Sequence, residues 1–307
     1  TLSALHAVVG GGVVAGSTGE WAAAAGAKGM IPLGGWASGV AAAETAIRAR
    51  VQLQARNPVA RDTTATSGTA KEFAPAQTAE NWDNVGVLVR CAQEVTGVLC
   101  ALDITPATVR EARAVGCNAI VSHHPVIFRP LKELRQGDVP ALLVREGVSA
   151  VCMHTNLDKA QGGVNDVLAQ ALGLRDTEPF AGGIGRVGAL PETMEAAAFA
   201  PFVGTALAAP VKWAEAHGPV RRVAVVSGSG GDFSAEAAAA GADCLVTGED
   251  GHHDALAALA AGVTPVAAPH FAPETAIAGV LAHRIAEAFP GLRVQRSAAD
   301  ADPFLYF

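Results

Sequence analysis

The stretch GVLCALDITPATVREARAVGCNAIVSHHP, residues 97–125, holds two short apolar runs with a helical pattern between them. The runs at 97–102 and 118–122 are rich in Val, Leu and Ile, which is typical of buried strands. Between the runs, Thr105 is suited to cap a helix and Pro106 to occupy its first turn. A strand, a helix and a strand in this order favour parallel pairing, so the sequence predicts an α/β layer.

The same alternation continues on both sides of this stretch. Further apolar runs of strand length lie at 85–90, 149–153, 221–228, 241–248, 263–269 and 292–297. Helical patterns lie near 233–240, 252–261 and 273–288. Residues 174–218 hold a stretch rich in Gly and Pro with one helix, which we interpret as the crossover into a second domain. We therefore predict two α/β domains with mixed, largely parallel sheets, over residues 65–173 and 174–307.

The composition narrows the class of protein. Half of the 307 residues are hydrophobic and 17% are charged, which is ample material for two buried cores. The net charge of −7, with no basic block, argues against a nucleic-acid partner. No apolar run reaches the ~18 residues of a membrane span, and the start of the chain lacks a signal-peptide pattern. The five cysteines are scattered, as is typical of reduced thiols, so we expect a cytoplasmic protein.

Residues 1–64 differ in composition from the rest of the chain. They are dominated by small residues and by polar, turn-forming stretches. Gly10, Gly12 and Ala15 fit the G-x-G-x-x-A pattern of dinucleotide-binding folds. That pattern needs a following helix, a second strand and an acidic residue about 20 positions on, and none of these is clear here. We interpret this region as a low-complexity N-terminal extension of unknown order.

Six of the nine histidines come directly after strand-like runs. They are His123, His124, His154, His252, His253 and His270. Two carboxylates, Asp158 and Glu274, lie in the same segments. Ligands of open α/β sheets bind at the carboxyl ends of the strands, so the sequence predicts a ligand site at this edge.

The neighbouring histidines His123 and His124 favour two metal ions over one. Successive side chains of a strand point to opposite faces, and Pro125 keeps His124 extended, so the two imidazoles diverge. The predicted ligands are His123, His124, Asp158, His270 and Glu274. Three imidazoles and two carboxylates suit a pair of divalent ions, with zinc, iron, manganese and cobalt as the candidates.

Pro273 bears on the geometry of the last two predicted ligands. His270 and Glu274 are four residues apart, but Pro273 argues against two ligands on one helical turn. We expect Pro273 to open a helix instead, with His270 on the preceding loop and Glu274 in the first turn. An acidic group there is favoured by the helix dipole.

Several other positions have two interpretations. His154 is either a ligand or a partner of the backbone, and Asp103 either caps a helix or accepts from a ligating histidine. His252 and His253 form either a solvated helix start or a wall of the active site. The SGSGGDF turn at 227–233 is either an anion-binding nest or a plain tight turn.

Nine segments occur in an order that is similar to a known family. They are AENWDNVGVLV, ALDITP, VSHHPVIF, HTNLDKAQGGVND, GGIGRVG, VSGSGGDF, VTGEDGHHDAL, HFAPETA and DADPFLYF. Over about residues 70–307 the chain resembles the Nif-three-like dinuclear metal-centre proteins, also called GTP cyclohydrolase 1 type 2 homologues. The resemblance implies two α/β domains that enclose a dinuclear metal site at their interface. It places the ligands on the same five residues and implies a toroidal homohexamer.

The function implied is that of a hydrolase dependent on two metal ions. Hydroxide generated by the metals would attack a nucleotide-like substrate, and one form is the purine ring opening of a GTP cyclohydrolase. His154, His252 and His253 are candidate catalytic residues that would relay protons. The alternatives are a metal-dependent phosphoesterase and a non-catalytic ring that binds metal or acts as a scaffold.

Overall fold

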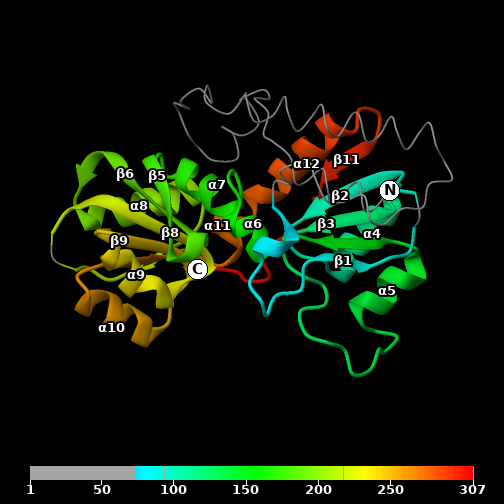
Figure 1. Cartoon of the computed structure of the whole chain (residues 1–307), viewed down its shortest axis with the longest axis horizontal. Helices are drawn as coiled ribbons and strands as arrows, with labels where there is room; N and C mark the ends of the chain where they lie inside the picture. The colour runs from blue at the N-terminus through cyan, green and yellow to red at the C-terminus, as the bar shows by residue number, and fades with distance from the viewer. Residues whose placement is uncertain (1–73, 93, 217, 307) are drawn as a thin grey trace. The chain divides into compact units, whose positions relative to one another are not determined.

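A computed structural model describes residues 74–306 except residues 93 and 217 (Figure 1). The described residues form two compact units. The first comprises residues 74–157 and 278–300, and the second comprises residues 158–277 and 301–306. The expected N-terminal extension over residues 1–64 lies outside the described residues.

The first unit is built on a five-stranded sheet with the order β1-β4-β3-β2-β11. Its strands are β1 (Gly86–Val89), β2 (Gly97–Ala101), β3 (Ala119–Ser122), β4 (Ser149–Cys152) and β11 (Arg293–Arg296). Three of its four pairings are parallel, and β1 runs antiparallel to β4. Every residue of β2, β3 and β4 is buried, so both faces of the sheet are covered.

The helix α4 (Pro106–Ala114) connects β2 to β3 and begins as the sequence predicts. The hydroxyl of Thr105 accepts a hydrogen bond from the Thr108 amide at 3.2 Å, and the Thr108 hydroxyl accepts from the Thr105 amide at 2.8 Å. Pro106 occupies the first turn, where its missing N–H leaves no helical bond unmade. The β2–α4–β3 unit predicted from residues 97–125 is therefore confirmed.

The other helices of the first unit follow the same alternation. They are α5 (Val139–Glu146), which precedes β4, and most of α12 (Ala276–Ala288), which precedes β11. The short helix α6 (Thr155–Lys159) begins in the first unit, and the boundary between the units falls after its third residue, Leu157.

The strand β11 belongs to the first sheet, although the sequence suggested the second set of strands for residues 292–297. It pairs in parallel with β2, with Arg293 beside Gly97, and the Ser297 amide donates to the Cys100 carbonyl oxygen at 2.8 Å. A strand pattern does not specify which sheet edge the strand will meet. The division into units therefore differs from the expected boundary at residue 174, because the chain returns to the first sheet at its end.

The second unit contains a six-stranded sheet with the order β5-β6-β8-β9-β10-β7. Its strands are β5 (Arg175–Phe180), β6 (Gly185–Met194), β7 (Lys212–Trp213), β8 (Val220–Ser229), β9 (Cys244–Glu249) and β10 (Thr264–Ala267). Only the β8–β9 and β9–β10 pairings are parallel. The expectation of largely parallel pairing is wrong for this sheet, because β5, β6 and β7 arise within residues 174–218, where one helix was expected.

Helices cover both faces of the second sheet (Figure 1). They are α7 (Val164–Ala171), α8 (Ala196–Leu207), α9 (Ser234–Ala239), α10 (His252–Ala260) and α11 (Phe271–Glu274). Along β8, Val223 and Val225 pack in one core with Phe199 of α8, whereas Val226 packs in another with Ala237 of α9. The alternation of a strand thus feeds two apolar layers. Within residues 74–306, as far as they are described, no helix has the length and apolarity needed to cross a membrane.

Candidate metal centre

Three histidines converge beyond the carboxyl ends of two adjacent strands of the first sheet. His123 and His124 follow β3, and His154 follows β4, which pairs in parallel with β3. The ring centroids lie 5.1 Å apart for His123 and His124, 5.3 Å for His123 and His154, and 5.9 Å for His124 and His154. One ring nitrogen from each histidine lies within 4.8 Å of the other two. The predicted edge therefore brings these three imidazoles together.

Each of the three rings is oriented by an acceptor at its Nδ1 atom. The partners are the Met153 carbonyl oxygen for His123, the Asp103 carboxylate for His124 and the Asp83 carboxylate for His154, all at 2.9 Å. Because an oxygen acceptor requires a proton on Nδ1, the neutral ring keeps its lone pair on Nε2. Histidines that bind metals are held in this way, so the donor set fits a divalent cation.

The two carboxylates that orient His124 and His154 differ in their surroundings. The Asp103 side chain is 43% exposed, and since Thr105 caps the following helix, its visible role is to accept from His124. The Asp83 side chain is fully covered and also accepts from the amide and the hydroxyl of Thr155. Asp83 was not among the residues predicted from the sequence, because 71 positions separate it from His154.

The ionisation of Asp83 follows from these contacts. Burial alone raises its pKa, but the hydrogen bonds from His154 and Thr155 outweigh burial and lower the pKa to about 2. The carboxylate is therefore negative at neutral pH. It fixes the direction of the His154 ring through the bond at Nδ1.

The predicted metal ligands of the second unit include two buried carboxylates and only one imidazole. Glu274 at the end of α11 is 3% exposed and Asp158 in α6 is 8% exposed. An oxygen of Asp158 lies within 4.8 Å of an oxygen of Glu274, and the Ser227 hydroxyl donates to Asp158 at 3.3 Å. Two buried carboxylates at this separation repel each other, and a bound cation would offset the repulsion.

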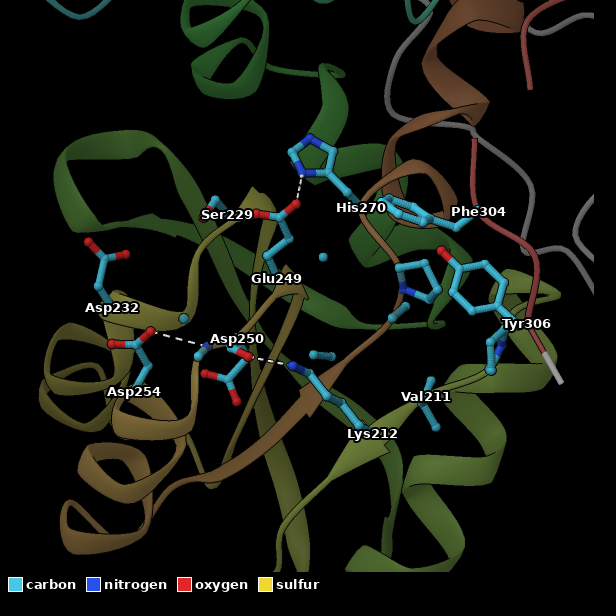
Figure 2. A pocket seen from close by; sticks show the side chains of 17 residues that line it. Val211, Lys212, Ser229, Asp232, Glu249, Asp250, Asp254, His270, Phe304 and Tyr306 are labelled. Atoms are coloured by element: carbon cyan, nitrogen blue, oxygen red, sulfur yellow. Dashed lines mark hydrogen bonds and ion pairs between the residues drawn. The ribbon is translucent and has the colours of Figure 1, made fainter. Parts of the chain in front are cut away.

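His270 lies between the carboxylates of Glu249 and Glu274, and Figure 2 shows its contact with Glu249. Its Nδ1 atom lies 3.0 Å from Glu249, and its Nε2 atom lies 3.2 Å from Glu274. A neutral imidazole has one proton for these two acceptors, so one carboxylate faces a lone pair unless the ring is protonated or a cation lies there. The position of His270 between two carboxylates therefore also suits a metal ligand.

Pro273 does not open the helix, contrary to the expectation from the sequence. It is the third residue of α11, and His270 is the N-cap, with helical backbone angles of −45° and −45°. The first N–H groups of a helix have no partner within it, so a proline is tolerated there. His270 and Glu274 therefore flank one helical turn, the arrangement that Pro273 argued against, while Glu274 lies in the first turn as expected.

Two glycines make room for these side chains. Gly228 has a φ of +64°, and a Cβ atom there would lie 2.7 Å from the Glu274 carboxylate. A Cβ atom on Gly248 would lie 3.0 Å from the Cα atom of His270. The SGSGGDF turn thus packs against the predicted ligands, and its Gly230 amide donates to the Thr247 hydroxyl at 3.0 Å.

His252 and His253 occupy the exposed start of α10, with ring centroids 5.4 Å apart. Among the described residues of the chain, neither belongs to a group of three or more side chains spaced for a metal ion. The structure brings together the histidines at the ends of β3 and β4 but leaves this pair in solvent.

Comparisons with known proteins agree on one family. Residues 64–303 match the family model described as Duf34/NIF3 (NGG1p interacting factor 3). A protein named GTP cyclohydrolase 1 type 2 homolog from Lactococcus lactis is 32% identical over 245 residues, covering 76% of this chain and 95% of that protein. A protein of the same name from Clostridium perfringens is 31% identical over 197 residues, covering 60% of this chain and 75% of that one. The crystal structure of a Staphylococcus aureus hypothetical protein superimposes with a TM-score of 0.70 at 30% identity, covering 76% of this chain and 95% of that chain.

Proposed function

The chain belongs to the Duf34/NIF3 (NGG1p interacting factor 3) family, and on this premise we propose that it is a metal-dependent hydrolase acting on a nucleotide-like substrate. The observation that carries the proposal is the convergence of His123, His124 and His154, each ring held at Nδ1 by an acceptor. Clustered imidazoles with fixed tautomers are typical of metal ligands.

The proposed ligands of two divalent ions are His123, His124, Asp158, His270 and Glu274. The first unit supplies nitrogen donors, and the second supplies mainly carboxylate oxygens. This mixture suits zinc, iron, manganese or cobalt. A pair of such ions supplies Lewis acidity and an activated water at neutral pH, which is the chemistry that hydrolysis requires.

The proposed role of His154 is proton transfer at its Nε2 atom. The ionised Asp83 accepts from Nδ1 and would stabilise the imidazolium that forms when Nε2 takes a proton. Trp82 and Phe128 lie edge-on to this ring, with centroids 6.3 and 6.0 Å away. His252 and His253, which are exposed, would exchange protons with solvent.

The substrate class is supported by the names of the relatives, GTP cyclohydrolase 1 type 2 homolog. Purine ring opening and phosphoester hydrolysis both need an activated water and a proton donor for the leaving atom, so the same residues would serve either reaction. The toroidal homohexamer and the cytoplasmic location expected from the sequence stay predictions, which light scattering and cell fractionation would test.

Metal analysis by plasma mass spectrometry tests the proposal directly. The purified full chain should hold about two transition-metal ions, and His124→Ala should lose them. The control is His283→Ala, because His283 lies on α12 and pairs with Glu287 at 3.3 Å outside the proposed ligand set. Metal in the wild type without hydrolysis of any nucleotide would favour a metal-binding scaffold. A chain that takes up no metal would remove the hydrolase proposal.

A further inference from the structure

A pocket of about 920 Å³ lies in the second unit, beside His270 (Figure 2). It is lined by residues at and after the ends of β8, β9 and β10, by residues 210–212 at the start of β7, and by the C-terminal residues Phe304 and Tyr306. Small-molecule sites in proteins have volumes of about 300–1,000 Å³, so a molecule of nucleoside size would fit.

The two sides of this pocket differ in chemistry. The apolar part of the lining comprises Val211, Pro269, Phe304 and Tyr306. Three acids, Asp232, Asp250 and Asp254, form an acidic part, and a fourth acid, Glu249, lies beside His270. In Figure 2 the two aromatic rings lie close to His270, and Asp232, Asp250 and Asp254 lie across the cavity from them. Phe304 is 68% exposed and Tyr306 is 47% exposed, which is unusual for aromatic rings and leaves surface for a ligand to cover.

The charge of the lining is negative. Lys212 is the single lysine or arginine among the lining residues, and its ammonium already donates to the Asp250 backbone oxygen. The lining thus holds four carboxylates and one ammonium group. A polyphosphate that entered the pocket would meet like charges, which disfavour binding.

The chain holds two of the acids differently. Asp254 accepts from the Gly251 amide at 3.1 Å at the start of α10. One oxygen of Asp250 is buried against Gly231 and has no hydrogen-bond partner among the described residues, so only its other oxygen can meet a ligand in the pocket as the structure stands. Carboxylate oxygens that face the pocket are suited to accept from a ligand that presents adjacent N–H donors.

We propose that this pocket recognises a planar heterocycle rich in N–H donors, neutral or cationic, and that no phosphate chain enters it. As the name of a substrate class the inference rests on the proposed function, whereas the recognition itself rests on the pocket, which shares only His270 with the five proposed metal ligands. The guanine base of a nucleoside has the required form. Its ring would stack on Phe304 and Tyr306, and its N1–H and 2-amino groups would donate to Asp250 or Asp254.

Equilibrium binding tests this inference. Guanosine, inosine and GTP are titrated into the full chain in EDTA, so that contacts between phosphate and metal do not contribute. Guanosine should bind at least about tenfold more tightly than GTP, a difference of about 1.4 kcal/mol. Inosine, which lacks the 2-amino group, should bind more weakly than guanosine. Tighter binding of GTP, or no binding of either nucleoside, overturns the inference.

Substitutions in the pocket test whether it causes the difference in affinity between guanosine and GTP. The double variant Asp250→Asn with Asp254→Asn should weaken guanosine binding. It should also lower the ratio of the GTP dissociation constant to the guanosine dissociation constant by about tenfold. Tyr306→Leu should weaken guanosine and inosine alike, because both rings stack. The control Glu192→Gln removes one exposed charge of the same unit outside the pocket, and it should leave the affinities for guanosine, inosine and GTP unchanged. An unchanged ratio of guanosine to GTP in the double variant overturns the inference.

The two proposals fail separately. His124→Ala should lose metal yet keep guanosine affinity in EDTA, since His124 is not part of the pocket. If the wild type takes up no metal but discriminates guanosine from GTP, the hydrolase proposal falls and the pocket stands. If metal binds and turnover is measured while the pocket variants bind as the wild type does, the pocket inference falls alone.

Discussion

The two units differ in the kind of metal-binding side chains that they hold. In the first unit, His123, His124 and His154 are each oriented by a separate acceptor at Nδ1. In the second unit, Glu274 lies close to Asp158, and His270 lies between Glu249 and Glu274. That arrangement concentrates negative charge. Under the proposed function, the first unit would supply ligands of fixed orientation, whereas the second would supply negative charge.

The largest expected effects come from removing one ligand on each side of this comparison. His123→Ala and Glu274→Gln should both lower metal affinity by at least about 100-fold, since even outer partners of ligands contribute about 10- to 100-fold. In the metal-free protein, the two substitutions should change the free energy of unfolding in opposite directions. His123→Ala leaves the Met153 carbonyl without its donor and should lower the free energy of unfolding by about 1–3 kcal/mol.

Glu274→Gln removes the charge that repels Asp158 and keeps a side chain that can hydrogen-bond to His270, so it should raise the free energy of unfolding of the metal-free protein by about 1 kcal/mol. Calorimetry in EDTA measures both variants, and competition with a chelating dye measures metal affinity. If Glu274→Gln destabilises the metal-free protein as much as His123→Ala does, the proposed difference between the units is wrong.

Gly228→Ala tests the close packing around Glu274. The new Cβ atom would lie 2.7 Å from the carboxylate at a backbone φ of +64°, so Glu274 must move. Metal affinity should fall by about tenfold, and stability by about 1–3 kcal/mol from the strained backbone. The matched control is Gly262→Ala, at a φ of +77° with nothing within 4 Å of the new atom. This control should show the loss of stability but keep the metal.

Asp83→Asn tests orientation in the first unit. The substitution weakens the partner of His154 and should lower turnover by about tenfold, with a smaller change in metal content. It also predicts a pH effect. The pKa of Asp83 is lowered from 3.8 to about 2 on folding, so its stabilisation is present above about pH 4 and is lost as the pH falls towards 2.

Acid denaturation curves would reveal this effect, because the wild type should lose stability between about pH 4 and 2 more steeply than Asp83→Asn. Glu94→Gln, a change at an exposed acid of the same unit, should follow the wild type. If the wild type and Asp83→Asn lost stability equally steeply between about pH 4 and 2, the role of Asp83 as the acceptor that orients His154 would be contradicted.

The smallest expected effect is that of Asp103→Asn. Asp103 accepts from His124 as Asp83 does from His154, but its side chain is 43% exposed, and water can replace it. Metal affinity should fall only about two- to fivefold, less than the 10-fold typical of buried partners. A loss as large as that expected for the ligands themselves would show that exposure does not separate the two carboxylates.

The sequence predicted those parts of the fold that depend on local patterns. The β2–α4–β3 unit follows from two apolar runs and the Thr105–Pro106 cap. By contrast, β5 has five exposed residues and β7 has two residues in all, so neither produces an apolar run. The sheet to which β11 belongs depends on a pairing almost 200 residues away along the chain, which no local pattern encodes.

The candidate site follows the same rule. His123, His124 and His154 could be predicted because each follows a buried strand, and parallel strands end at one edge. Asp83 and Phe128 could not, because they meet His154 through loops rather than through strand ends. The acids of the pocket were missed for a related reason, since their shared surface exists only after the second sheet has formed.

The position of β11 also bears on the order in which the chain matures during synthesis. Residues 158–277 form a complete sheet before β11 leaves the ribosome, whereas β2 lacks its outer neighbour until residue 296 has emerged. An unpaired strand edge invites association with other chains. A nascent chain that stalls after residue 277 would therefore present β2, whose five residues are all buried in the finished fold, as an exposed edge strand.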